Sequence, residues 1–182
     1  QVNNYTGGDL ILQGGGQGGN VGIGVTPKAA WRSTCLGVQF GTSSALWQSG
    51  GDNTLFSQNV YEHTDTSRKY IITGEASYYY QYNGGHFWET FASGTADASL
   101  ATASGVMAMV ESGKVGIGTA TPDSHLHIYR GSAGSVTANS GAALTIEDDA
   151  TAYIQFLLPE STEGGLIFGQ GTDNNVGGIF YS

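Results

Sequence analysis

The sequence contains few charged residues and a single cysteine. Asp, Glu, Lys and Arg make up 12% of its 182 residues, about half of the share in an average globular protein. Exposed helix faces normally draw on Glu, Lys and Arg, so this shortage disfavours a helical domain. An internal disulfide is excluded because Cys35 has no possible partner. We expect its thiol to be buried and unreactive, since Arg32 is the only basic residue close to it in sequence.

Basic residues are scarcer still. Six Lys and Arg stand against fifteen Asp and Glu, which gives a formal net charge of −9. Nucleic acids and anionic membrane surfaces both attract clusters of Lys and Arg, so neither is an expected partner. No apolar run approaches the roughly 20 residues that a membrane-spanning helix needs. Membrane insertion is therefore not expected.

Glycine and alternating apolar residues are abundant instead. The chain has 30 glycines, about twice the usual share, and glycine permits the positive φ angles of tight turns. Leu36, Val38 and Phe40 alternate with small or polar residues, which indicates a strand with one apolar face. Alternating tyrosines at 78–82 precede Asn83-Gly84-Gly85, a strong hairpin signal. We predict an all-β fold of short strands joined by Gly-rich turns.

Three further strands are predicted near the end of the chain, at Ala152–Leu158, Leu166–Phe168 and Ile179–Tyr181. The Ala-rich stretch 96–108 is not expected to be helical, because it contains Gly105 and several Ser and Thr residues.

One element occurs twice. The segment 20–27 (NVGIGVTP) returns at 114–122 as KVGIGTATP. In each copy β-branched residues alternate with glycine, so that one side of the strand is apolar and the other is bare enough for a second backbone to approach. The repeat suggests two β modules, residues 1–112 with the aromatic-rich strands and residues 113–182. Periodicity alone leaves open whether one chain closes a β-sandwich or three chains wind together.

The second copy extends into a longer motif. The segment Gly113–Ile128 (GKVGIGTATPDSHLHI) resembles the GNVGIGT-xxP-xxx-LHV element of phage tail fibres and tail spikes, which there precedes a self-cleaving C-terminal intramolecular chaperone. Gly19–Pro27 matches the same element less completely, with Val25 where the family usually has Thr. Patterns within Arg68–Thr95 and Leu144–Tyr181 are also similar to tail-fibre sequences.

This resemblance implies an elongated, intertwined homotrimer in the tail fibre of a virion. Its partners would be other tail proteins of the virion. At the extracellular surface of the host it would bind a saccharide or an outer-membrane protein. The Ser-Asp start and the basic segment of the chaperone are not found in this sequence, so we expect no protease activity. The sequence also shows no nucleophile elbow, zinc-protease helix or Cys-His arrangement, so we expect no other enzymatic activity and no cofactor. A purely structural spacer and a glycan-degrading spike are the alternatives, since fifteen acidic residues could supply a pair of catalytic carboxylates.

The apolar positions of the repeat and one row of aromatic residues are candidates for packing between the three chains. This set comprises Val21, Ile23, Val115, Ile117, Tyr78, Tyr80 and Phe87.

Tyr and Trp combine a flat apolar surface with a polar tip, which suits recognition of a sugar or of a protein patch. The candidates for receptor binding are Tyr79, Trp88, Tyr61 and His86. For the aromatic residues as a group, subunit packing is the stronger expectation.

Other motifs carry weaker signals. His125 and His127 share a strand face and could bind one metal ion, although two surface histidines are the simpler interpretation. Glu147–Asp149 and Asp173–Asn175 are interpreted as solvated turns, because they lack the ligand spacing of a calcium loop. Gly14–Gly19 fits GxGxxG, but a strand rather than a helix is expected after it, so we interpret it as a flexible turn.

Overall fold

The computed structural model describes residues 3–4, 10–11, 20–51 and 53–181. All regular secondary structure in these residues is β-strand, which confirms the all-β prediction. No helix in this part of the chain is long and apolar enough to cross a membrane. The chain divides into two compact units, unit 1 at 1–149 and unit 2 at 150–182.

The strands of unit 1 are β1 (Asn3–Asn4), β2 (Leu10–Ile11), β3 (Val21–Ile23), β4 (Leu36–Phe40), β5 (Ser44–Ser49), β6 (Asn53–Gln58), β7 (Val60–Glu62), β8 (Arg68–Tyr70), β9 (Gly74–Tyr82), β10 (Gly85–Gly94), β11 (Gly105–Met109), β12 (Val115–Ile117), β13 (Leu126–Tyr129) and β14 (Leu144–Glu147). Unit 2 contains β15 (Gly164–Gln170) and β16 (Asp173–Tyr181).

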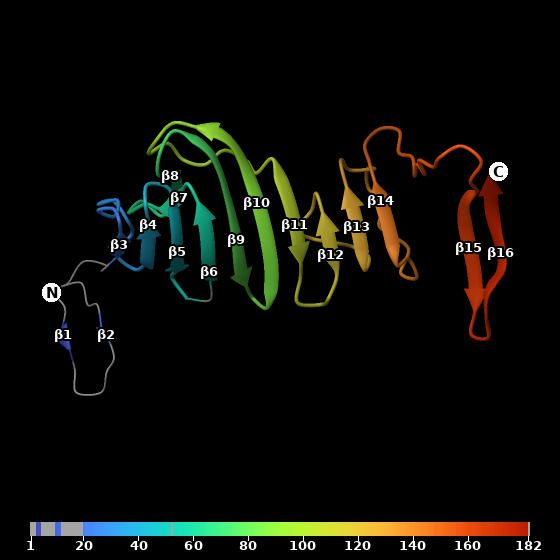
Figure 1. Ribbon diagram of the computed structural model, residues 1–182, viewed down its shortest axis with the longest axis horizontal. Helices are drawn as coiled ribbons and strands as arrows, with labels where there is room; N and C mark the ends of the chain where they lie inside the picture. Colours follow the sequence, from blue (N-terminus) through green and yellow to red (C-terminus); the bar gives the residue numbers. More distant parts are fainter. Residues whose placement is uncertain (1–2, 5–9, 12–19, 52, 182) are drawn as a thin grey trace. The chain divides into compact units, whose positions relative to one another are not determined.

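Unit 1 is built on one ten-stranded sheet, in the order β14-β13-β12-β11-β10-β9-β6-β5-β4-β3 (Figure 1). Most neighbours are antiparallel, whereas β3–β4, β12–β13 and β13–β14 are parallel. Strands β11 and β12 pair directly, so the sheet continues across the predicted module boundary at 112/113. The compact units instead divide at 149/150.

Both copies of the repeated element form the same strand and turn. Gly24 and Gly118 have φ angles of 71° and 83°, which end the strands at Ile23 and Ile117. We predicted that a second backbone segment would approach the glycine side of each strand. The approaching segment is the turn that directly follows the strand in the same copy of the repeat. A Cβ on Gly22 would lie 2.0 Å from the carbonyl oxygen of Val25, and a Cβ on Gly116 would lie 2.3 Å from that of Thr119.

The predicted hairpin at 83–85 is also present. Gly85 pairs with Tyr82, which leaves Asn83 and Gly84 as a two-residue turn between β9 and β10. Their φ angles are 47° and 73°, and two successive positive values match the type I′ turn that Asn-Gly favours.

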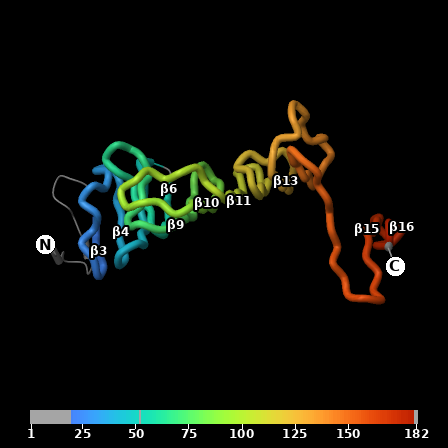
Figure 2. The backbone as a smooth tube through the Cα atoms, turned by 90° about the horizontal axis from the view of Figure 1, so that it is seen from above, coloured from blue at the N-terminus to red at the C-terminus, as the bar shows by residue number. Residues whose placement is uncertain are grey.

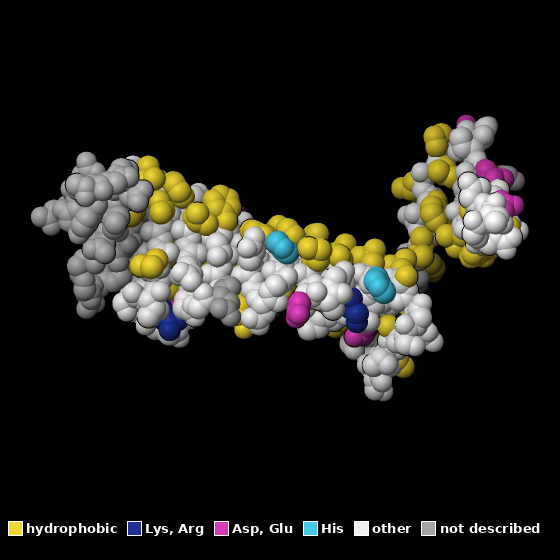
Figure 3. All heavy atoms as spheres, turned by 90° about the horizontal axis from the view of Figure 1, so that it is seen from below, with side chains coloured by type: hydrophobic (Ala, Val, Ile, Leu, Met, Phe, Trp, Pro, Cys, Tyr) yellow, Lys and Arg dark blue, Asp and Glu magenta, His cyan; other side chains and the backbone are white. Residues whose placement is uncertain are grey.

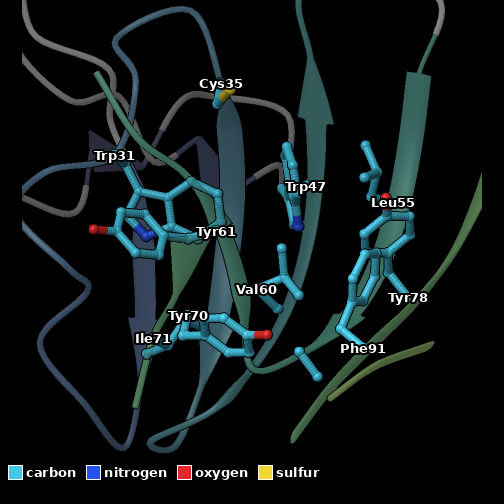
Figure 4. Packing of buried hydrophobic residues seen from close by; sticks show 12 residues of the cluster. Trp31, Cys35, Trp47, Leu55, Val60, Tyr61, Tyr70, Ile71, Tyr78 and Phe91 are labelled. Atoms are coloured by element: carbon cyan, nitrogen blue, oxygen red, sulfur yellow. The ribbon is translucent and has the colours of Figure 1, made fainter. Parts of the chain in front are cut away.

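A second layer covers one face of the large sheet over β4, β5, β6, β9 and β10. It contains the small β7–β8 sheet, the segment 30–32, whose Trp31 is bridged to His63, and the segment 95–103. Its place over that part of unit 1 can be followed in Figure 2. The core lies between the layers, where the rings of Trp31 and Trp47 are 5.4 Å apart and those of Tyr78 and Phe91 are 5.2 Å apart (Figure 4). The Trp31–Trp47 contact joins the second layer to the sheet, whereas Tyr78 and Phe91 pack side by side on the sheet beneath it.

Unit 2 is a single β-hairpin preceded by an extended segment. Leu166 pairs with Ile179 on one face and Gly165 with Phe180 on the other, so apolar side chains lie on both faces and are exposed. The strand predicted at Ala152–Leu158 is wrong, because these residues have no ladder partner and are exposed. The strands predicted at Leu166–Phe168 and Ile179–Tyr181 lie within β15 and β16, and Asp173–Asn175 opens β16 rather than forming a turn.

Candidate assembly and recognition surfaces

The two faces of the large sheet differ in what covers them. Trp47 in β5 points into the core and is 2% exposed, whereas its neighbour Leu46 is 43% exposed on the opposite face. The same alternation separates Leu55 from Phe56, which is 59% exposed. One face is therefore packed within the chain, and the other carries large apolar side chains with no cover from the described residues.

These exposed residues are aligned in register across the whole sheet. Directly paired residues lie on the same side, and one unbroken set of pairs passes through every strand. We call this set the apolar row: Val21, Val38, Leu46, Phe56, Tyr79, Trp88, Met107, Ile117, Ile128 and Ile146. With about 4.8 Å between strands, the row is about 43 Å long.

The apolar row is flanked by positions without formal charge. One flanking row contains Leu36, Gln48, Thr54, Gln81, His86, Met109, Val115, Leu126 and Leu144. The other contains Ile23, Phe40, Ser44, Gln58, Ser77, Thr90 and Gly105. None of these residues is Asp, Glu, Lys or Arg, and Figure 3 shows the resulting band of hydrophobic side chains along unit 1.

Three of the residues predicted to bind a receptor meet on this face. The Tyr79 ring lies 5.1 Å from that of Trp88 and stacks 5.9 Å from that of His86. The Tyr79 hydroxyl and His86 Nδ1 are hydrogen-bonded at 2.5 Å. The three rings therefore form a connected aromatic group at the middle of the apolar row.

The fourth receptor candidate, Tyr61, is buried, so that expectation is wrong for this residue. It lies in the core with its ring 5.7 Å from that of Trp31, and its hydroxyl donates to Asp97 Oδ1 at 2.7 Å. Its isolated position in the sequence gave no sign of this, because the burial comes from the second layer folding over the sheet.

The residues predicted to pack between chains divide between the two faces. Val21, Ile23, Val115 and Ile117 lie on the face of the apolar row, as do the receptor candidates. Tyr78, Tyr80 and Phe87 lie on the opposite face, where Tyr78 is buried in the chain's own core. Alternation had predicted that Tyr79 and Trp88 lie on the face opposite Tyr78, Tyr80 and Phe87, and the strand register agrees. Alternation separates the faces, but it does not tell which one the same chain covers.

The core-facing tyrosines hold a part-buried electrostatic network. Arg68 Nη1 donates to the Tyr78 hydroxyl at 2.8 Å, and that hydroxyl donates to Glu89 Oε2 at 2.5 Å. The Tyr80 hydroxyl donates to Glu89 Oε1 at 3.1 Å. Burial, with the Glu89 carboxylate beside it, raises the pKa of Tyr80 to about 12, and burial raises the pKa of Tyr78 well above its usual value. Both hydroxyls therefore remain protonated donors at neutral pH.

Cys35 is buried, as predicted. Burial raises the pKa of its thiol to about 11, and the carboxylate of Glu62 adds to this effect. Almost no thiolate forms at neutral pH, so the residue is unreactive.

The residues that could hold a metal ion differ from the predicted pair. His127 is buried and groups with Asp123 and Glu147, with one potential ligand atom from each within 4.8 Å of the others, and His125 is not part of this group. His127 Nδ1 accepts the backbone N–H of Asp123, so the neutral ring carries its proton on Nε2, which lies 3.2 Å from Glu147 Oε2. Nε2 is buried and makes no hydrogen bond within the described part of the chain, so Asp123, His127 and Glu147 stay a candidate metal group in place of the predicted pair. The Gly14–Gly19 motif lies outside the described residues.

The chain matches no protein-family model, no curated protein and no solved structure. The likeness to tail-fibre elements consequently depends on the motif residues themselves.

Proposed function

We propose that this chain is a segment of a phage tail fibre that assembles with copies of itself into a homotrimer and contributes to attachment at the host surface. The observation that carries the proposal is the apolar row, an uncharged apolar band across all ten strands of one sheet. The tail-fibre class and the number three come from the likeness of Gly113–Ile128 to tail-fibre elements.

Hydrophobic energetics favour covering this face. Monomeric proteins rarely expose a contiguous apolar patch larger than a few hundred Å². Fully burying one Val, Leu, Ile, Phe or Met side chain contributes about 1.5–3 kcal/mol, and the row supplies an apolar or aromatic side chain at each of the ten strands.

Charge favours a second copy of the same chain as the cover. The formal net charge of −9 makes copies repel one another over most of their surfaces. The face of the apolar row is the place where that repulsion is weakest, because its three rows of paired residues contain no Asp, Glu, Lys or Arg.

Unit 2 supports association independently. A two-stranded hairpin is at best marginally stable in water, and this one exposes Leu166, Ile179 and Phe180 on two faces. Cover on both faces calls for more than one partner segment, as intertwined chains would provide.

Thiol cross-linking tests the assembly. Phe56→Cys places a thiol on the apolar row, and Ile72→Cys places one on an exposed apolar position outside it. Buried Cys35 can stay in both proteins. Mild oxidation should link Phe56→Cys chains rapidly and Ile72→Cys chains slowly. Equal rates for the two variants would contradict assembly over this face.

Binding of the labelled full chain to a panel of bacterial cells tests attachment. Saturable binding to some strains, competed by unlabelled protein, is expected. Correct assembly without binding to any strain that the parent virion infects would leave the purely structural spacer as the better interpretation.

A further inference from the structure

A polar cavity lies on the face of unit 1 opposite the apolar row. Its volume is about 510 Å³, and Ser49, Tyr78 and Phe91 of the sheet line it on one side. Residues of the second layer complete it: Arg32, Glu62, Thr66, Ser67, Arg68, Ser99, Leu100 and Ala101. If copies pack over the apolar row, as the proposed function has it, this cavity remains on the outside of the assembly.

Arg68 differs from the other cations of the chain. Lys28, Arg32, Lys69 and Arg130 each lie within 2.6–2.8 Å of a carboxylate oxygen. Arg68 has no carboxylate within 4.0 Å among the described residues, and Lys114 shares this property but donates to a backbone carbonyl. In a chain with fifteen acidic residues, a guanidinium at a cavity wall with no carboxylate in direct contact, linked to Glu89 only through the Tyr78 hydroxyl, is suited to an anion from outside.

The surroundings hold Arg68 in place. Its guanidinium carbon lies 4.9 Å, 5.6 Å and 5.9 Å from the ring centres of Tyr78, Tyr80 and Trp47. The hydrogen bond from Nη1 to the Tyr78 hydroxyl fixes one edge of the planar group, and its remaining N–H groups are available for a bidentate contact. Little side-chain entropy is then left to lose when a carboxylate binds.

The rest of the lining suits a sugar. The Ser49 and Ser67 hydroxyls already donate to Glu62 and Asp65, so their lone pairs can accept from sugar hydroxyls. Phe91 and Leu100 supply apolar wall for the C–H face of a ring. We infer that the cavity binds a carboxylate-bearing sugar residue of a surface glycan, with Arg68 holding the carboxylate. This inference rests on the proposed function for its biological setting, and the cavity would be the recognition site of the fibre.

Calorimetry and saturation-transfer NMR on the assembled full chain test this, with N-acetylneuraminic acid and galacturonic acid as anionic probes and methyl β-galactoside as the neutral probe. At least one anionic probe should bind, and its affinity should fall as the NaCl concentration is raised. The affinity of the neutral sugar should be at least tenfold lower than that of this anionic probe. Arg68→Met keeps the aliphatic stem and should weaken the anionic probe at least tenfold. The matched control Lys114→Met should bind like the wild type.

Three results would overturn the inference: no binding of either anionic probe, equal binding of the neutral sugar, or unchanged binding in Arg68→Met. The solution mass and the far-UV spectrum of Arg68→Met should equal those of the wild type, and Arg68→Lys provides a second variant if they do not. Arg68→Lys keeps the charge but lacks the planar fork, so intermediate affinity is expected and wild-type affinity would contradict a bidentate contact. A monomeric chain that still binds the sugar would refute the assembly and leave the cavity site standing.

Discussion

Leu46 and Trp47 are neighbours in β5, yet their side chains lie on opposite faces of the sheet in opposite environments. Trp47 packs against Trp31 in the core and donates through Nε1 to the Ser57 hydroxyl at 3.0 Å, whereas Leu46 is exposed between Val38 and Phe56 in the apolar row. The chain thus builds its own core on one side of the sheet and leaves an apolar surface on the other.

This difference predicts two kinds of destabilisation. Trp47→Ala should lower the free energy of unfolding by about 3–5 kcal/mol, because it leaves a cavity in the core and removes the hydrogen bond from Nε1 to the Ser57 hydroxyl. The loss should be similar at every protein concentration. Leu46→Ala should destabilise more as the protein concentration rises, since it weakens association rather than the fold of one chain. Urea unfolding at several protein concentrations distinguishes the two, and a concentration-independent effect of Leu46→Ala would count against the assembly.

A charge placed on the apolar row should prevent association. In Phe56→Glu, an unpaired carboxylate would be buried between copies, whereas one chain alone leaves this position exposed. The assembly is expected to dissociate with the far-UV spectrum retained. Ile72→Glu, at an exposed apolar position off the row, is the control and should assemble normally. Sedimentation velocity measures both, and dissociation in the control alone would refute the assignment of the interface.

The repeated turns depend on their glycines. Gly22→Ala and Gly116→Ala would each drive a Cβ into a backbone carbonyl, so the turn must shift, at a cost of about 1–3 kcal/mol. Gly171→Ala is the control, because its Cβ would meet no atom within 4 Å. Thermal unfolding should show a lower midpoint for both turn variants and little change for the control. An unchanged midpoint in Gly116→Ala would contradict the observed turn.

Asp97 should contribute stability that depends on pH. Hydrogen bonds from Lys28 and then from Tyr61 lower the pKa of its carboxyl below its usual value. A carboxyl with a lowered pKa stabilises the fold above its unfolded pKa of about 3.9, and this contribution disappears as the pH falls through the folded pKa. The Asp97 side chain is 58% exposed, so solvent screening keeps this contribution small. Asp97→Asn should therefore cost about 1 kcal/mol at pH 7 and progressively less below pH 4. Urea unfolding at pH 7, 5 and 3 measures the difference, and a constant cost at all three values would contradict the role of the ionised carboxylate.

Local signals in the sequence were sufficient for several elements. Asn83-Gly84 specifies its turn through its own positive φ angles, and the alternation at Leu36–Phe40 produces β4. The repeated glycines predicted a close backbone approach, although the approaching backbone comes from the same turn.

Features that depend on distant residues could not be predicted. Tyr61 is buried because Trp31 and Asp97, far away in sequence, pack around it. The choice between the Tyr78 and Tyr79 faces depends on which side the second layer covers. The extended segment 152–158 has strand-like composition but no strand partner among the residues that the structure describes, and a strand requires one.

Sedimentation equilibrium of the full chain tests the central claim most directly. The account predicts a single species with three times the mass of one chain, which Phe56→Glu converts to the single-chain mass. A wild-type chain that remains a stable, folded monomer at micromolar concentration would contradict the account, because the apolar row would then be exposed to water along the whole sheet.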